Sequence, residues 1–158
     1  MMNGALTIGT QDGANVEIGE YVGSDNIFTF GLTSEEVFTY QMRGDYRARD
    51  YYNNDRRLRN VMDLLVNQHF SGDDVEFKDI FYSLLYNNDE YFVLRDFDSY
   101  VSTQNKVNHT YQQQEQWLEK SIINIAHSGA FSSDRTIQEY ADDIWKIRPI
   151  TIPTHPIL

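Results

Sequence analysis

The sequence predicts an α/β protein in which a short parallel β unit precedes a longer series of amphipathic helices. Two short apolar runs, residues 5–8 and 27–30, are each closed by a glycine, and a helical segment lies between them. After Gly31 the apolar residues recur at helical spacing. Because neighbouring parallel strands need a crossover connection, the order strand, helix, strand indicates a βαβ-like unit. Two strands form no stable sheet alone, so we expect this unit to be the edge of a larger sheet.

We expect three regions along the chain. Residues 1–31 hold the strand–loop–helix–strand unit, residues 32–148 hold the helices that cover it, and residues 149–158 form an extended tail that contains all three prolines. In the first region Asp12 is expected to cap a helix over residues 14–18, which Gly19 and Gly23 then end.

The sequence predicts six helices in the second region. Thr33 and Glu36 have capping-box spacing and open a helix through residues 37–41, and Ser132 or Ser133 is the expected N-cap of the last helix. Between and after these positions, apolar stripes with the i, i+3, i+4 spacing of one helix face predict five amphipathic helices. The stripes are Leu58, Val61, Met62 and Leu65; Phe77, Ile80, Phe81, Leu84 and Leu85; Phe97, Tyr100, Val101, Gln104 and Val107; Leu118, Ile122, Ile125 and Ala126; and Ile137, Tyr140, Ala141 and Ile144.

Composition excludes several classes of function. The chain of 158 residues has 24 acidic and 13 basic side chains, a formal charge of −11, which argues against binding to nucleic acid or to anionic membranes. The absence of cysteine excludes a disulfide framework and a thiolate site, and it suits a reducing compartment. No apolar run approaches the length of a membrane span, and no basic segment of a secretory signal is visible at the start. We therefore expect a soluble cytoplasmic protein.

The most informative local segment is residues 4–15, where a strand leads through a glycine loop into a helix. Such a loop can bind an anion through free backbone N–H groups. It is neither a Walker loop nor a dinucleotide fingerprint, because the required spacings are absent, and Asp12 would repel a phosphate. The alternatives are a small anion site over residues 9–14 and a tight turn followed by a capped helix.

The other candidate groups favour structural interpretations. The acidic pairs and the four histidines have no spacing that presets a proton-sharing dyad or a metal site. These residues are Asp73, Asp74, Asp142, Asp143, His69, His109, His127 and His155. The arginine-rich residues 43–59 could contact phosphate or glucan, but a solvated helical face with pairs such as Asp55–Arg59 is the better interpretation. The many aromatic side chains could stack on sugars, although their helical spacing indicates core positions.

Several longer strings resemble one family. Asn3-Gly-Ala-Leu-Thr-Ile-Gly-Thr10, followed by Asp12-Gly-Ala-Asn-Val-Glu17, looks like the segment directly after the cofactor lysine of the α-glucan phosphorylases, which act on glycogen, starch and maltodextrin. Ile123-Asn-Ile-Ala126 and Phe131-Ser-Ser-Asp-Arg-Thr-Ile137 resemble the C-terminal signature of the same family. The resemblance runs in order from residue 1 to about residue 149.

This resemblance implies the last part of a two-lobed GT-B glycosyltransferase, within its Rossmann-like C-terminal lobe. In the family, phosphate cleaves the terminal α-1,4 bond of a glucan to release glucose 1-phosphate, and pyridoxal phosphate is bound to a lysine. The family pattern places that lysine just before Met1, and the lysines present are Lys78, Lys106, Lys120 and Lys146, all in outer helical segments. We therefore assign no catalytic, cofactor-binding or metal residue to this chain, and residues 3–15 carry over only as a segment that packs behind the cofactor.

The expectation is a C-terminal fragment of an α-glucan phosphorylase that is inactive alone and binds no pyridoxal phosphate at a specific site. Glucan and phosphate are the partners that the resemblance implies for the parent enzyme. The alternative is a non-enzymatic helical module that binds a partner or self-associates as a homo-oligomer, because the two strands lack sheet neighbours and apolar faces would be uncovered.

Overall fold

A computed structural model describes residues 1–67, 75–148 and 150 of the chain. It is mostly helical with two short parallel strands, which confirms the predicted α/β class at this level. The first unit comprises β1 (Ile8–Thr10), α1 (Ala14–Val22), a short 3₁₀ turn η1 (Ser24–Asn26) and β2 (Phe28–Phe30). The strands pair in the register Ile8 with Phe28 and Thr10 with Phe30. The predicted order strand, helix, strand is therefore confirmed.

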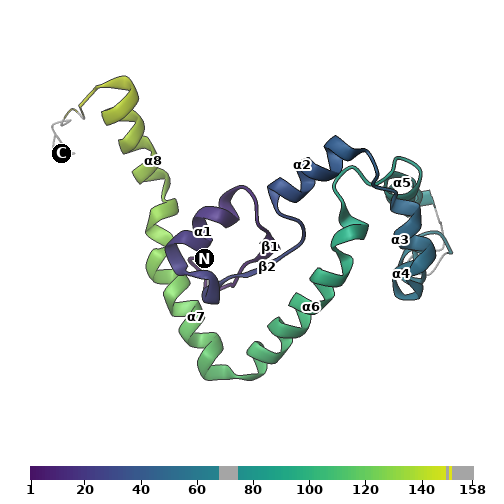
Figure 1. Cartoon of the computed structure of the whole chain (residues 1–158). Helices are drawn as coiled ribbons and strands as arrows, with labels where there is room; N and C mark the ends of the chain where they lie inside the picture. Colours follow the sequence, from purple (N-terminus) through teal and green to yellow (C-terminus); the bar gives the residue numbers. More distant parts are fainter. Residues whose placement is uncertain (68–74, 149, 151–158) are drawn as a thin grey trace, which may run out of the picture.

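The remaining helices follow in one series. They are α2 (Ser34–Arg43), α3 (Ala48–Asn54), α4 (Arg56–Leu64), α5 (Val75–Leu85), α6 (Val93–Gln112), α7 (Gln114–His127), η2 (Ser128–Phe131), α8 (Ser133–Glu139) and the π-helical turn η3 (Tyr140–Trp145). Figure 1 shows α6 and α7 as the two arms of a V, with the strands and α1 between them. Helices α2 to α5 gather at the far end of α6, and α8 continues beyond α7. Among the described residues, no helix is long and apolar enough to cross a membrane.

Helix ends confirm two of the predicted caps and correct a third. Thr33 and Glu36 form a full capping box at the start of α2, with the Thr33 N–H donating to Glu36 Oε2 at 2.9 Å. The Ser132 hydroxyl accepts from the N–H of Asp134 and caps α8. Asp12, however, does not cap α1: the N-cap is Gly13, and no side chain bonds to the helix end.

The boundaries of the first unit also differ from the prediction. Helix α1 continues through Gly19 and ends only at Gly23, whose φ of +82° favours glycine. Strand β1 begins at Ile8, the last residue of the predicted strand, and runs through Gly9. Gly9 therefore lies inside the strand and does not end it. The Asn15 side chain approaches Gly9 closely, as described below.

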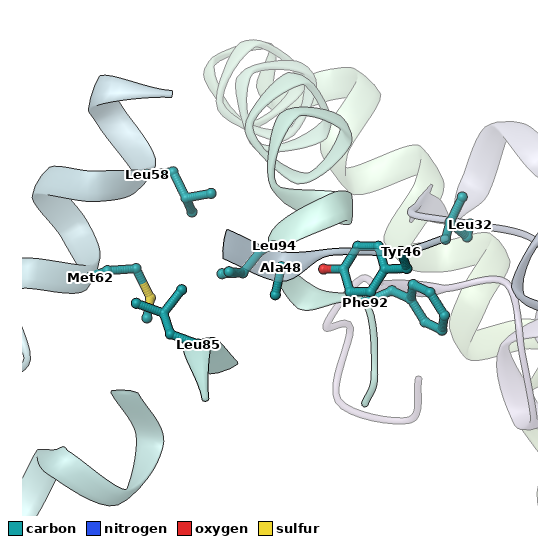
Figure 2. Close-up of a cluster of buried hydrophobic side chains, with 8 residues drawn as sticks. All are labelled: Leu32, Tyr46, Ala48, Leu58, Met62, Leu85, Phe92 and Leu94. Carbon is teal, nitrogen blue, oxygen red and sulfur yellow. The ribbon is translucent and has the colours of Figure 1, made fainter. Parts of the chain in front are cut away.

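A cluster of buried apolar side chains lies among α2 to α6 rather than on the strands. Figure 2 shows its members, which are Leu32, Tyr46, Ala48, Leu58, Met62, Leu85, Phe92 and Leu94. Helical periodicity marked three of them, Leu58, Met62 and Leu85. Tyr46 and Phe92 belong to connecting segments, and their rings pack 4.7 Å apart between centroids. Burial of these two aromatic rings therefore ties the connections into the same core as the helices.

The apolar stripe of α7 is not covered. Leu118, Ile122 and Ile125 are respectively 55%, 64% and 44% exposed. The sequence correctly predicted that these residues share a helix, since α7 spans Gln114–His127. Within the described part of the chain no element covers this face, so the periodicity identified a surface that is apolar without being core.

Candidate functional site

The carboxyl end of β1 enters the glycine-bearing loop that is the most informative segment of the sequence. Thr10 ends the strand, and its hydroxyl donates to Asp12 Oδ2 at 2.9 Å. Asn15 in α1 reaches back, and its Nδ2 donates to the Thr10 carbonyl at 2.8 Å. A Cβ at Gly9 would lie 2.5 Å from this same Asn15 Nδ2, so a larger residue here would have to displace the Asn15 side chain. The loop is thus held by its own side chains.

This arrangement leaves little capacity for an anion. The N–H of Asn15 donates to the Asp12 carbonyl at 3.1 Å, and the N–H of Val16 donates to the Gly13 carbonyl at 3.3 Å. The Asp12 carboxylate stands in the same loop and would repel a phosphate. Of the two interpretations that the sequence leaves open, the geometry favours the tight turn, with Gly13 rather than Asp12 at the helix start.

A cavity of about 640 Å³ opens at this end of the strands. Its walls are mainly apolar and include Phe30, Phe97 and Tyr100, of which the Phe30 and Tyr100 rings pack edge to face at 5.1 Å. The carboxylates of Asp12 and Asp96 also line it, whereas the described lining residues include no lysine or arginine. Phosphate recognition relies on cations and free N–H groups, so the composition of this cavity does not suit a phosphate.

Asp96, which lines the same cavity, fixes the backbone that follows β2. Its Oδ1 accepts from the N–H of Leu32 at 2.9 Å, which fixes the chain as it leaves β2. Burial raises the pKa of this carboxyl, and the hydrogen bond from Leu32 opposes that rise. A Cβ at Gly31 would lie 2.5 Å from Asp96 Oδ2, and the φ of +84° at this position also favours glycine. Both Asp96 and Gly31 therefore serve the packing of α6 against β2.

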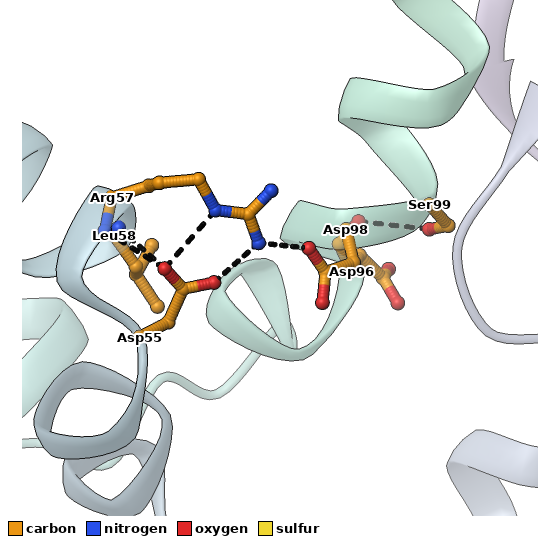
Figure 3. Close-up of polar contacts among 6 residues, drawn as sticks. All are labelled: Asp55, Arg57, Leu58, Asp96, Asp98 and Ser99. Atoms are coloured by element: carbon orange, nitrogen blue, oxygen red, sulfur yellow. Dashed lines mark hydrogen bonds and ion pairs between the residues drawn. The ribbon is translucent and has the colours of Figure 1, made fainter.

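The arginine-rich residues 43–59 form local pairs on helix surfaces. Arg57 bridges Asp55 and Asp98, as Figure 3 shows, and its hydrogen bonds hold the pKa of Asp55 down to about 2. The predicted pair Asp55–Arg59 is wrong, because Arg59 donates instead to the carbonyls of residues 52 and 53. The i,i+4 spacing of a helix favoured Arg59, but Asp55 precedes α4 as its N-cap and faces the first turn, where Arg57 lies. These contacts support a solvated face rather than a shared anion site.

The acidic pair and the histidines that the structure describes stay apart. Asp142 and Asp143 are exposed in η3, and Asp142 accepts a hydrogen bond from Gln138. His109 contacts Gln113, and His127, in the last turn of α7, contacts the carbonyl of residue 123. No group of three potential metal ligands occurs among the described residues. Asp73, Asp74, His69, His155 and the prolines of the tail lie outside them.

A buried polar cluster at the start of α6 was not found from the sequence. The Tyr46 hydroxyl donates to Asp89 Oδ2 at 2.8 Å, and the two Asp89 oxygens also accept from the N–H groups of Val93 and Leu94. Burial and then the Asp89 carboxylate raise the pKa of Tyr46. Asp89 lies four positions before α6 begins at Val93, and an aspartate near a helix start is a usual signal for a cap, but no sequence pattern marked its pairing with Tyr46. With every oxygen engaged, the cluster anchors α6 and presents no free group for chemistry.

Comparison with known proteins identifies the family. The family model described as carbohydrate phosphorylase matches residues 1–147. The chain is 60% identical over 150 residues to the glycogen phosphorylase of Bacillus subtilis (strain 168), covering 95% of this chain and 19% of that protein. The chain belongs to the carbohydrate phosphorylase family.

Other relatives in this family lead to the same assignment. Identity is 51% over 152 residues with the glycogen phosphorylase of Synechocystis, covering 96% of this chain and 18% of that protein. It is 45% over 157 residues with the brain form of glycogen phosphorylase from Ovis aries, covering 99% of this chain and 18% of that protein. The chain thus spans less than a fifth of the length of these phosphorylases. The resemblance drawn from the two end motifs is confirmed, and the alternative of an unrelated interaction module is not favoured.

The lysines of this phosphorylase chain do not form an anchor for pyridoxal phosphate. Lys106 and Lys146 are exposed on α6 and after η3, and the ammonium of Lys120 donates to the carbonyl of Asp25. Five cavities among the described residues have neither these three lysines nor Lys78 in their walls. A Schiff base needs an amine that faces a pocket large enough for the cofactor, so the residues present do not fit this group.

Proposed function

We propose that this chain serves as the C-terminal structural part of an α-1,4-glucan phosphorylase. The observation that carries the proposal is identity of 45–60% to glycogen phosphorylases over 95–99% of the chain. The reaction proposed for the whole enzyme is cleavage of a terminal α-1,4 bond by phosphate, with release of glucose 1-phosphate. Its partners would be an α-glucan and phosphate, and the cysteine-free sequence accords with a cytoplasmic location.

In this proposal the chain belongs to the C-terminal lobe of a GT-B fold. Residues 1–31 supply the last part of the parallel sheet, residues 32–148 supply helices that cover the lobe, and residues 3–15 pack behind the cofactor. The hydrogen bonds among Thr10, Asp12 and Asn15 support this role, because they make the loop rigid without any bound group. The lobe's reactive groups would come from the remaining part of the enzyme.

The proposal assigns no catalytic residue to this chain, so the chain alone should be inactive. Pyridoxal phosphate would be held by a lysine in the remaining part of the enzyme. The cavity at the strand ends has mainly apolar walls, and its charged lining residues among those described are Asp12 and Asp96, which supports a structural rather than a phosphate-handling part of the enzyme.

The test is an assay of the purified chain with glycogen and phosphate, with the Bacillus subtilis relative as the active control. We expect no glucose 1-phosphate and no stoichiometric internal-aldimine absorbance after pyridoxal phosphate is added. Borohydride reduction followed by peptide mapping should find sparse label spread over the lysines. Label concentrated on one lysine, together with phosphorolysis, would overturn the proposal.

A further inference from the structure

The cavity of about 640 Å³ at the carboxyl ends of β1 and β2, called here the strand-end cavity, has the size of a small-molecule site. Pockets that bind small molecules occupy roughly 300–1,000 Å³ and combine apolar walls with a few polar groups. The strand-end cavity has both features, because its walls are mainly apolar and two carboxylates also line them. The residues used in the argument below are Thr10, Asp12, Phe30, Tyr91, Asp96 and Tyr100.

Aromatic rings form much of its wall. The rings of Phe30 and Tyr100 pack edge to face, and Tyr91, which is 79% exposed, lies where the cavity meets solvent. The face of an aromatic ring attracts a cation as well as burying apolar surface. A ring of this wall already has such a contact, since the Arg57 guanidinium lies 5.5 Å from the centroid of Phe97. The wall therefore suits an apolar body that carries a positive charge.

The two carboxylates of the cavity converge on the Thr10 side chain. The Thr10 hydroxyl donates to Asp12 Oδ2 at 2.9 Å. Asp96 Oδ2 and Thr10 Cγ2 lie 2.5 and 3.1 Å from one point, the position that a Cβ would take at Gly31. Two carboxylates that approach the same side chain repel each other, and the described lining residues include no lysine or arginine to compensate.

Each carboxylate also retains an oxygen for a ligand. Asp12 uses Oδ2 for Thr10, and Asp96 uses Oδ1 for the N–H of Leu32. Among the described residues no hydrogen bond reaches the second oxygen of either side chain. Asp96 is only 9% exposed, so its second oxygen is largely withdrawn from bulk water. A donor that enters the cavity would supply the hydrogen bond that this oxygen lacks.

We propose that the strand-end cavity binds a small organic cation, a protonated amine on an aromatic body. The body packs on Phe30 and Tyr100, and the ammonium group donates to the second oxygens of Asp12 and Asp96. Charge-assisted hydrogen bonds beside an apolar wall favour this cation over a neutral molecule of the same shape. The inference goes beyond the proposed function, because it concerns neither glucan nor phosphate.

Other ligand classes fit the cavity less well. An anion would meet two carboxylates. A metal ion would find too few ligands, since no group of three potential metal ligands occurs in the described part of the chain, and a mainly apolar wall cannot replace its water. A neutral aromatic molecule would bury the same surface but leave the carboxylates unpaired, so it is the comparison that the experiment needs.

The experiment titrates the 158-residue chain at neutral pH with three probes of nearly equal shape, by calorimetry and by amide NMR. The probes are 1-naphthylmethylamine, which is protonated at this pH, 1-naphthalenemethanol, which is neutral, and 1-naphthoate, which is an anion. We expect the amine to bind about tenfold more tightly than the alcohol, and the anion not to bind. The largest amide shifts on binding of the amine should fall at residues 10–12, 31–32 and 96–100, which border the cavity.

Two charge-removing substitutions form a matched pair. Asp12→Asn keeps an oxygen that can accept from Thr10 and removes the charge, so it should weaken binding of the amine about fivefold and leave the alcohol unaffected. Asp25→Asn removes the same formal charge from an exposed position in η1, outside the cavity, and should change binding less than about twofold. Circular dichroism of each variant shows whether the helices are retained.

A second pair tests the space itself. Val61→Trp enlarges a half-exposed side chain of α4 that lines the cavity, and should weaken binding of both the amine and the alcohol about tenfold. Val16→Trp makes the same change on α1, away from the cavity, and should have no effect.

Three results would overturn the inference. They are equal affinity for the amine and the alcohol, equal effects of Asp12→Asn and Asp25→Asn, and amide shifts confined to other parts of the chain, such as the exposed stripe of α7. None of these measurements involves phosphorolysis, so failure here leaves the proposed function untouched.

Discussion

At the scale of single residues, Gly31 joins the strand unit to the helices. Its φ of +84° is a backbone conformation that other residues rarely adopt, and a Cβ would meet Asp96 Oδ2 at 2.5 Å. We expect Gly31→Ala to lower the free energy of unfolding by about 3 kcal/mol, since it adds backbone strain and displaces the acceptor of the Leu32 N–H. Urea unfolding followed by circular dichroism measures the loss.

Gly44 provides the matched control for Gly31. It also has a positive φ, +62°, but no atom lies within 4 Å of the position of a Cβ. Gly44→Ala should therefore cost only the backbone term, about 1 kcal/mol. Equal losses for the two variants would show that the contact with Asp96 has no energetic role.

Asp55 gives the chain a dependence on pH at acidic values. The hydrogen bonds from Arg57 hold the pKa of Asp55 at about 2 in the folded chain, against roughly 3.9 in an unfolded one. A depressed pKa means that the stabilisation is fully present above pH 4 and is lost as the pH falls toward 2. Asp55→Asn keeps an N-cap for α4 and removes the charge, so the difference in unfolding free energy between the two proteins should shrink from pH 4 to pH 2.

Salt provides the control for this pH effect. Arg57, Asp55 and Asp98 are all on the surface, so 1 M NaCl should reduce the difference between Asp55→Asn and the unaltered chain at pH 5. A difference that remains constant from pH 5 to pH 2 would show that the Asp55–Arg57 pair does not stabilise the fold.

At the scale of elements, α6 replaces a strand along the edge of β2. Thr103 is buried, and its hydroxyl satisfies the Thr29 carbonyl. Thr103→Val preserves the shape of the side chain and leaves that carbonyl without its donor, so we expect a loss of about 1–2 kcal/mol. Thermal and urea unfolding measure this value.

Thr110→Val is the matched variant on the same helix. The Thr110 hydroxyl bonds within α6, to the carbonyl of Lys106, and not to another element. Its substitution should change stability by no more than about 0.5 kcal/mol. If Thr103→Val were as mild, the hydroxyl of Thr103 would not be needed to close the edge of β2.

The same elements show what the sequence could predict. Periodicity identified α4, α5, α6, α7 and α8 because an apolar stripe depends only on helix geometry. It could not tell that Leu118 and Ile122 remain exposed, since covering a stripe depends on which other segments are present. The cap at Thr33 was local and was predicted correctly, whereas Asp12 bonds to Thr10 and leaves the helix end to Gly13.

The candidate site shows the same division between local and long-range information. The loop over residues 9–14 was recognisable because its glycines and Asp12 are adjacent in sequence. The contacts of Asp96 with Leu32 and of Tyr46 with Asp89 join residues more than forty positions apart, and no local pattern marks them. Family resemblance supplied what local physics did not, namely that the loop belongs to a phosphorylase.

At the scale of the whole molecule, the described structure has its core at one end. The cluster that includes Leu58, Met62 and Leu94 joins α2 to α6, whereas the strands lie between the arms of the V, and α8 extends beyond α7 (Figure 1). The two ends of this chain therefore differ in how much their stability comes from buried contacts within the chain. The α2–α6 end has a core of its own, and the α7–α8 end is more exposed.

This asymmetry predicts two levels of hydrogen exchange in the isolated chain. Amides of the first half of α6 around Leu94 should open only with global unfolding, because Leu94 is buried in the core and its N–H donates to Asp89. Amides of α8 should exchange near the rate of an unfolded peptide, since α8 has no buried residue and its link to α1, from Arg135 to Tyr21, is exposed. Exchange measured over a urea series by mass spectrometry should leave α8 unaffected while protection around Leu94 falls with global stability. Equal protection of α8 and α6 would instead mean that the whole chain unfolds as one cooperative unit, and that the exposed apolar faces of α7 and α8 do not weaken their end of the molecule.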